Sequence, residues 1–285
     1  MAKFEVPEID MSDTPLTSLT KFVDYRAESI QIARIQSKSS APKELRQVIT
    51  QIKKELDTTG IIKLTNSGIS DHPLAFTVFA SQIGKYKGGP LHNKNQFGTP
   101  TLSKKIRGYP QKIETNFQNH EIELTPHNDV IERVFHLGVP DYSFFLGIQD
   151  VPGIQTEFRN ASDVLEQFKR KFPEMVERAL KLKEKTGYLG IKRSAVISPN
   201  SILYSKPDET FKKNSWFKYY LSDPDILEAI EEVLEETPPC FSTPLKEEEI
   251  ILSNQIKFPH NRVITDEFEN DSHQTRTFLN TRLWK

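Results

Sequence analysis

The run LTPHNDV, residues 124–130, sets the interpretation of the whole chain, because it places an imidazole and a carboxylate two residues apart in extended-looking sequence. In a β-strand, residues i and i+2 point to the same face, so His127 and Asp129 are placed to bind one metal ion from one side. With 7 histidines and 39 acidic residues among 285 positions, about one His-x-Asp or His-x-Glu pair is expected by chance. The meaning of the pair therefore depends on the segments around it.

The composition is that of a folded protein without a preference for polyanions. Hydrophobic residues make up 36% of the chain, with 18 Phe and 8 Tyr, which supplies ample aromatic mass for a core. The formal net charge of -1 provides no basic face to neutralise phosphates, so we expect no nucleic-acid partner. The length of 285 residues favours one β-rich domain, residues 1–285, over two small ones.

The only cysteine, Cys240, excludes an internal disulfide and a cysteine-based zinc site, which fits a reducing compartment. It follows two prolines in loop-like sequence without a histidine nearby, which favours an inert thiol over a nucleophile. The acidic N-terminus lacks the apolar run of a signal peptide, and no segment has the roughly 18 apolar residues of a membrane span. We expect a soluble, cytoplasmic protein with no membrane contact.

Apolar spacing and stop signals predict a chain of mixed helices and strands. Helices are expected over residues 20–36, 42–56, 71–83, 161–185 with a break at Pro173, and 223–236. Strands are expected over 61–64, 122–124, 142–148, 201–204, 216–221, 249–256 and 276–284, and residues 86–119 read as a long loop. The strands are aromatic-rich and lack regular βα alternation, which predicts an α+β fold with a jelly-roll (double-stranded β-helix) core decorated with helices.

Three further segments carry candidate site residues. A glycine turn at Gly153 presents the Thr156 hydroxyl at a strand start, although an ordinary hairpin turn with an exposed threonine is the favoured interpretation of this segment taken alone. His260 lies just beyond the strand at 249–256 and is the best candidate to complete a two-histidine, one-carboxylate facial triad, which leaves open positions on non-haem Fe(II). An ordinary core or surface histidine is the alternative.

The third segment is the C-terminal run from Arg276 to Trp284. Its period-two pattern puts Arg276 and Arg282 on one face, and Leu279 and Leu283 on the other. If the leucines face a core, both arginines face a cavity or solvent, and solvent is the expectation for either arginine taken alone.

In this order, the segments resemble the Fe(II)- and 2-oxoglutarate-dependent oxygenases of the clavaminate synthase and taurine dioxygenase family. The resemblance extends from about Gly60 to the C-terminus and is carried by the succession HxD at 127–129, Phe135-His136, Pro140-Asp141-Tyr142, an apolar strand, Gly153-x-x-Thr156 and Ala161-x-Asp163-Val164-Leu165. It implies that His127, Asp129 and His260 are the iron ligands at the catalytic centre. It also implies that Arg276 binds the distal carboxylate of 2-oxoglutarate and that Thr156 hydrogen-bonds the same co-substrate, since a guanidinium fork matches carboxylate geometry.

The resemblance further implies an oxidoreductase, a dioxygenase that hydroxylates a free amino acid or a small amino-acid-derived metabolite. O₂ is the other co-substrate, and succinate and CO₂ are the co-products; desaturation is a variant of the same chemistry. Asp129 separates a hydroxylase from halogenating relatives, which carry a small residue at that position. Residues 85–119 and 206–215 are candidate lids.

Several alternatives remain open at this point. Family members usually place the distal histidine five residues after an asparagine, whereas His260 is six after Asn254, which predicts a bulge or a shifted register. His273 is the rival distal ligand, and His136 is expected to be structural. The family's second C-terminal arginine is replaced by Asn280, with Arg282 next along the strand. Two other function classes are a non-catalytic jelly-roll binding protein and a zinc-dependent hydrolase that uses the same His and Asp residues.

Overall fold

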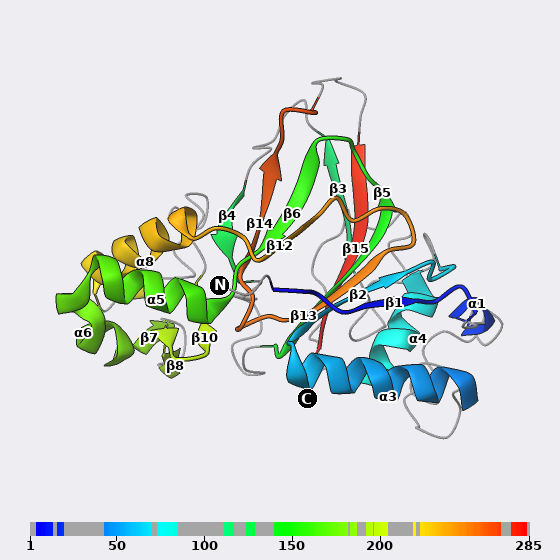
Figure 1. Ribbon diagram of the computed structural model, residues 1–285, viewed down its shortest axis with the longest axis horizontal. Coiled ribbons are helices and arrows are strands. Elements are labelled where there is room, and N and C mark those ends of the chain that lie inside the picture. The colour runs from blue at the N-terminus through cyan, green and yellow to red at the C-terminus, as the bar shows by residue number, and fades with distance from the viewer. Residues whose placement is uncertain are drawn as a thin grey trace.

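The structure, a computed structural model, describes residues 4–13, 16–19, 43–69, 73–84, 111–116, 124–128, 140–181, 183–186, 192–195, 197–204, 219–220, 223–268 and 275–283. Two main β-sheets lie between two groups of helices (Figure 1). The helices are α1 (Leu16–Leu19), α3 (Lys43–Thr58), α4 (Pro73–Ile83), α5 (Ala161–Lys171), the 3-10 helix η2 (Pro173–Met175), α6 (Val176–Lys181) and α8 (Pro224–Glu236). Within these described ranges, no helix combines the length and apolarity needed to cross a membrane.

The larger sheet has six strands in the order β1-β2-β13-β5-β15-β3, and its neighbouring strands are antiparallel except for β1 and β2. The strands are β1 (Glu8–Asp10), β2 (Ile61–Thr65), β13 (Ile250–Asn254), β5 (Tyr142–Gln149), β15 (Thr275–Leu283) and β3 (Gln111–Asn116). The inner strand β5 is buried on both faces: Phe144 and Leu146 pack on the helix side, whereas Phe145 packs on the other. This explains the unbroken apolar run that predicted the strand.

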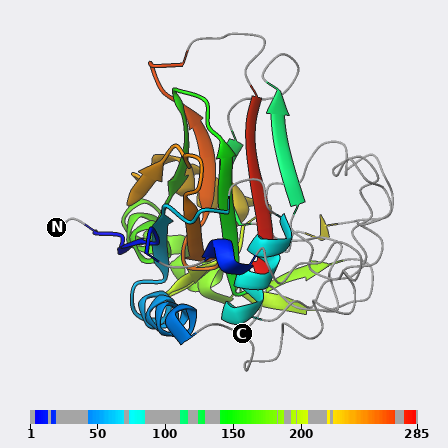
Figure 2. The same cartoon turned by 90° about the vertical axis from the view of Figure 1, so that its right-hand side faces the viewer.

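The smaller sheet has four antiparallel strands in the order β12-β6-β14-β4. They are β12 (Phe241–Thr243), β6 (Ile154–Phe158), β14 (His260–Ile264) and β4 (Leu124–His127). The two sheets pack face to face, because the ring of Phe145 from the larger sheet meets that of Phe158 from the smaller one edge-on, with centroids 6.4 Å apart. Figure 2 shows the long strands of the two sheets running alongside one another.

The N-terminal helices α1, α3 and α4 cover the outer face of the larger sheet (Figure 1). The apolar positions that predicted α3 and α4 lie in this core: Leu45, Ile49, Ile52, Leu56, Phe76, Phe79, Ala80 and Ile83 are buried, and Val48 packs against them half-buried. Gly60 ends the α3 region with a φ of 81°, and a Cβ there would lie 2.8 Å from the ring of Phe258. The predicted helix, tight stop and strand are therefore confirmed.

The second group, α5, η2, α6 and α8, lies beside the smaller sheet with a core of its own. Asn160 caps α5 by accepting from the backbone N–H of Ser162 at 3.0 Å, and Asp223 caps α8. The predicted break occurs at Pro173, which starts η2. Short strands accompany this group: β7 (Lys183–Thr186), β8 (Lys192–Ala195), β9 (Ile197–Ser198), β10 (Ser201–Ile202) and β11 (Tyr219–Tyr220).

The local sequence pattern gave a wrong prediction at two places. Strand β3 lies inside the predicted loop 86–119, since its pairing with β15 at the sheet edge supplies an order that its sequence does not signal. Residues 183–186 form β7 rather than the end of a helix, because they pair with β8 and β11. The helix expected over 20–36 lies outside the described residues. The chain is nevertheless α+β with mainly antiparallel sheets, as predicted.

Candidate functional site

His127 and His260 are brought together by neighbouring strands. His127 ends β4, His260 begins β14, and the two residues are register partners in this antiparallel ladder. Their ring centroids lie 4.8 Å apart. Residues directly opposite each other in a sheet project to the same face, so both imidazoles lie on one side of the smaller sheet. The register of the β14–β4 pair shifts between His260 and Arg262. This shift lies next to the segment between Asn254 and His260, where a bulge or shifted register was predicted.

The face that carries the two imidazoles is the one that packs against the larger sheet. The ring of Phe145 meets His260 edge-on at 5.2 Å, and the ring of Phe158 lies 5.9 Å from it. His260 is only 7% exposed. The histidine pair therefore lies between the sheets, and aromatic rings shield His260 from water.

Asp129, the third candidate ligand, lies outside the described residues, as do His136 and His273. Its neighbour Asn128 is described and is 1% exposed. The Asn128 side chain donates to the carbonyl of Gln255 at 2.6 Å and accepts from the backbone N–H of Tyr204 at 2.6 Å. The Asn128 backbone N–H donates to the Tyr204 carbonyl at 2.8 Å. Hydrogen bonds to Gln255 and Tyr204 thus fix the chain at Asn128, the residue between His127 and Asp129.

The two residues that hold Asn128 are themselves anchored. The side-chain oxygen of Gln255 accepts from the hydroxyl of Ser143 at 2.9 Å, and the Gln255 backbone N–H donates to the backbone carbonyl of Asp141 at 3.0 Å. Burial, followed by a hydrogen bond to Glu231 of α8, raises the pKa of the Tyr204 phenol. The end of β4 is therefore tied to the larger sheet and to the helices beside the smaller one.

Arg276 occupies the same inter-sheet space from the opposite sheet. It is 2% exposed, which corrects the expectation that this arginine taken alone faces solvent. Its Nη2 donates to the hydroxyl of Thr156 at 2.9 Å and to the carbonyl of Pro244 at 2.9 Å. Its Nε is buried and has no hydrogen-bond partner among the described residues. Thr156 and Arg276, predicted from separate segments, thus meet; the Arg282 side chain lies outside the described part of the chain.

The charge of Arg276 is poorly compensated. Burial, and then the positive charge of Arg262, lower its pKa to about 10, while Asp150 acts in the opposite direction. No ion pair among the described residues includes Arg276. A buried cation that meets only neutral acceptors is costly to the fold, so the site is suited to an incoming anion.

An aromatic contact path joins the arginine to the histidines. The guanidinium of Arg276 lies 5.6 Å from the centroid of the Phe278 ring, which is 6.0 Å from the ring of Phe145. Phe145 in turn contacts His260. One continuous apolar wall on the larger sheet therefore connects the candidate anion site with the candidate metal site.

Sequence reasoning missed four contributors to this site. Phe278 and Arg262 carried a usable signal, because each is two residues from a predicted site residue on the same strand, Arg276 and His260 respectively. Asn128 and the carbonyl of Pro244 carried none, since a buried amide and a backbone acceptor are recognisable only from their partners.

Sequence comparison matches the chain to no family model and to no curated protein. Solved structures do match. PvcB from Pseudomonas aeruginosa aligns with a TM-score of 0.54 at 10% identity over 82% of this chain and 79% of that one. The non-heme iron oxygenase OrfP with bound Fe aligns with a TM-score of 0.52 at 13% identity over 98% and 94%.

An asparagine oxygenase in complex with Fe(II), 2S,3S-3-hydroxyasparagine and succinate aligns with a TM-score of 0.52 at 12% identity, over 97% of this chain and 93% of that one. A second structure of PvcB, which aligns with a TM-score of 0.53 at 10% identity, is described as that of an Fe, alpha-ketoglutarate dependent oxygenase. The chain thus has the fold found in iron- and alpha-ketoglutarate-dependent oxygenases.

Proposed function

We propose that the protein is a non-haem Fe(II)- and 2-oxoglutarate-dependent dioxygenase of the clavaminate synthase and taurine dioxygenase family. The observation that carries the proposal is that two groups of side chains lie together between the sheets. One is a histidine pair on adjacent strands, and the other is a buried arginine whose hydrogen-bond acceptors among the described residues are neutral. The shared fold supports the same assignment.

The residues fit an iron centre. His127 and His260 supply two imidazoles from one face, and Asp129 follows His127 at the sequence spacing that predicts a carboxylate ligand. Two histidines and one carboxylate form the facial arrangement that holds Fe(II) and leaves positions for exogenous ligands. In the proposal these three residues bind the metal, and the Asn128 hydrogen bonds fix the backbone between two of them.

The residues also fit a dicarboxylate. Arg276 would bind the distal carboxylate of 2-oxoglutarate, because its guanidinium is buried and its Nε has no partner among the described residues. Thr156 orients that guanidinium and would hydrogen-bond the same co-substrate. Phe145 and Phe278 keep water from the space between the two sites.

When bound, Fe(II) supplies an oxidation in which 2-oxoglutarate, O₂ and a substrate C–H yield succinate, CO₂ and an alcohol. We infer a free amino acid or a small amino-acid derivative as substrate. One structure with a similar fold supports this class, because the asparagine oxygenase was solved with a hydroxylated asparagine. Hydroxylation is the proposed outcome, with Asp129 as the carboxylate ligand that favours it.

We also infer a jelly-roll core within a single domain, 1–285. Strands β3, β4, β5 and β6 alternate between the larger and smaller sheets, and β12, β13, β14 and β15 alternate again. This order is that of an eight-stranded double sheet built from two Greek keys. It accounts for the meeting of His127 with His260, which are far apart in sequence.

Anaerobic addition of Fe(II) and 2-oxoglutarate to the purified protein tests the proposal. We expect a visible metal-to-ligand charge-transfer band that is absent in a His127→Ala variant. Succinate formation in air, measured against a panel of free amino acids, then identifies the substrate class. Absence of the band from the native protein contradicts the proposal and leaves a binding protein, whereas hydrolysis with zinc and without 2-oxoglutarate indicates the hydrolase.

A further inference from the structure

The turn from Pro244 to Glu249, between β12 and β13, has an unusual backbone. Leu245 and Glu248 adopt left-handed conformations, with φ values of 59° and 62°. Among the described residues, Asn66 is the one other non-glycine residue with positive φ. Side chains disfavour this region, and such strain persists only where surrounding structure enforces it, often at functional sites.

The carboxylate of Glu249 enforces this conformation from inside the turn. It accepts from the backbone N–H of Lys246 at 2.9 Å and from the hydroxyl of Thr243 at 3.4 Å. Its second oxygen lies 2.8 Å from the ammonium of Lys63 on β2. Glu249 is 8% exposed, so these contacts are made largely away from water.

Strand β5 holds the turn from the other side. The Gly147 N–H donates to the Glu249 carbonyl at 2.9 Å, and the Glu248 N–H donates to the Gly147 carbonyl at 3.1 Å. The turn lies so close that a Cβ at position 147 would be 2.0 Å from the carbonyl oxygen of Lys246. Only glycine permits this approach.

The turn presents one backbone oxygen to the candidate anion site. The carbonyl of Pro244, the residue before Leu245, accepts from Arg276 Nη2 at 2.9 Å. The second acceptor of that nitrogen is Thr156, which is the register partner of Thr243 on β12. Both acceptors on Nη2 are therefore placed by the β6–β12 pair and the turn that follows it.

We propose that Glu249 is a positioning residue for co-substrate binding: by locking the 244–249 turn, it holds the Pro244 carbonyl on Arg276 and so orients the guanidinium toward the distal carboxylate of a 2-oxo dicarboxylic acid. This inference rests on the proposed function. Glu249, which lies outside the candidate anion site, would then contribute to the preference of that site for a dicarboxylate over a monocarboxylate.

The experiment compares two 2-oxo acids on the full chain loaded with Mn²⁺. Both 2-oxoglutarate and 2-oxobutyrate chelate a metal through the 2-oxo acid, but only 2-oxoglutarate has a distal carboxylate. Their dissociation constants, measured by isothermal titration calorimetry, give a preference ratio that a general loss of stability does not change. Arg276→Gln serves as the reference for loss of that preference.

We expect Glu249→Ala to lower the ratio about tenfold, by weakening 2-oxoglutarate alone. Glu249→Gln keeps the size and an acceptor for the Lys246 N–H, so it should fold and lower the ratio less. The matched control is Glu8→Gln, which removes the other carboxylate near Lys63, 3.7 Å away with a side chain 56% exposed, and should leave the ratio unchanged.

A ratio within twofold of the native value in both Glu249 variants overturns the inference, even if their melting temperatures fall. If Arg276→Gln also keeps the native ratio, the proposed function fails as well. A ratio that depends on Arg276 but not on Glu249 therefore separates the two failures.

Discussion

His127 and His260 are register partners on adjacent antiparallel strands, and their ring centroids lie 4.8 Å apart. If these imidazoles bind Fe(II), removal of either leaves the ion with an incomplete ligand set. We expect His127→Ala and His260→Ala each to weaken binding of Fe(II) at least about tenfold, as loss of one ligand from a three-ligand site should. Anaerobic metal titration measures this.

His273→Ala is the control for that experiment. The variant should bind Fe(II) like the native protein, because His260 is the register partner of His127 on the neighbouring strand. Loss of metal in His273→Ala with retention in His260→Ala would reverse the assignment of the distal ligand.

Asn128→Ala should lower both stability and metal affinity. The substitution leaves the Gln255 carbonyl and the Tyr204 N–H without their buried partner, and each such loss costs about 1–3 kcal/mol. Because Asn128 lies between two proposed ligands, we also expect about tenfold weaker metal binding. Urea denaturation and metal titration measure the two effects. Gln51→Ala, which removes an exposed amide on α3, should change neither.

Arg159 ties the helices to the smaller sheet. Its Nε donates to the carbonyl of Thr237 at 2.8 Å, and it also contacts Glu157 and Asn261, the residue after His260. Burial is the main cause that lowers its pKa. Arg159→Met should destabilise the protein by about 3–5 kcal/mol, since it leaves Glu157 half-buried and without its cation.

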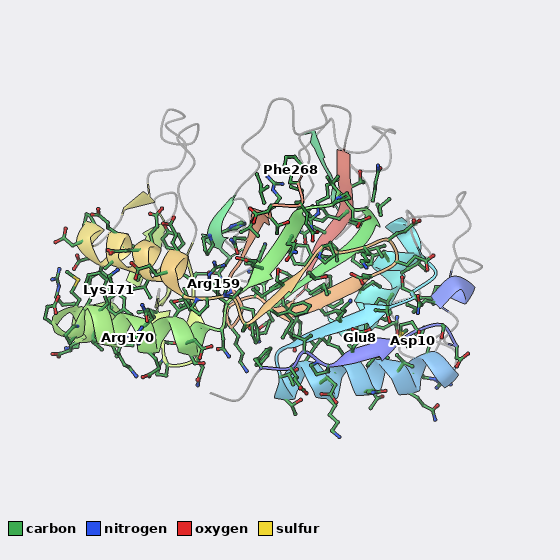
Figure 3. The ribbon with its side chains drawn as sticks, turned by 45° about the horizontal axis from the view of Figure 1, so that its top comes forward. Glu8, Asp10, Arg159, Arg170, Lys171 and Phe268 are labelled. Carbon is green, nitrogen blue, oxygen red and sulfur yellow. The ribbon has the colours of Figure 1, made fainter. Side chains whose placement is uncertain are left out.

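Arg170→Met is the matched control, because Arg170 lies on the exposed side of α5 while Arg159 lies toward the sheets (Figure 3). We expect its midpoint in urea to stay close to the native value. An equal shift in both variants would show that the loss reflects the arginine side chain in general and not the buried contacts.

Cys240 should be unreactive in the folded protein. Burial raises the pKa of its thiol to about 12. At pH 8 the thiolate fraction is then on the order of a thousandfold below that of an ordinary cysteine, so reaction with a disulfide reagent should be correspondingly slow until urea unfolds the chain. A fast reaction under native conditions would restore the nucleophile alternative.

The same shift has a defined pH dependence. Above about pH 8.5 the unfolded thiol loses its proton, whereas the folded thiol keeps it up to about 12. The unfolded state then binds fewer protons, so this group lowers stability as the pH rises through that window and has no effect below it. Cys240→Ser should remove this contribution from the alkaline limb of a stability profile.

Local sequence signals predicted the elements whose burial follows a simple period. Helices α3 and α4 follow from apolar spacing and a glycine stop, and β5 follows from an aromatic run. They did not predict β3, whose residues are ordered by pairing with β15. Nor did they predict that His260 starts its own strand in the other sheet, since the change of sheet between Asn254 and His260 depends on long-range pairing.

The candidate site also divides into residues that local sequence signals identified and contacts that depend on long-range packing. His127, Thr156, His260 and Arg276 were identified from motif order, and the structure brings the histidines together and Thr156 onto Arg276. Burial of Arg276 could not be inferred, because period two fixes its face and not what covers that face. The role of Asn128 was equally hidden, since both of its side-chain partners are backbone groups of distant segments.

The position of β15 in the larger sheet bears on how the protein reaches its native state. This strand lies between β5 and β3, and its partners, such as Leu146 for Leu279, are distant in sequence. Sheets built from non-local pairs close large loops before any pairing stabilises them, so they fold slowly. Until β15 docks, the aromatic strand β5 has an unpaired, aggregation-prone edge. The strand that carries Arg276 is thus also the one that covers the open edge of β5. Because aggregation through that edge depends on concentration, refolding yields should rise as the chain is diluted.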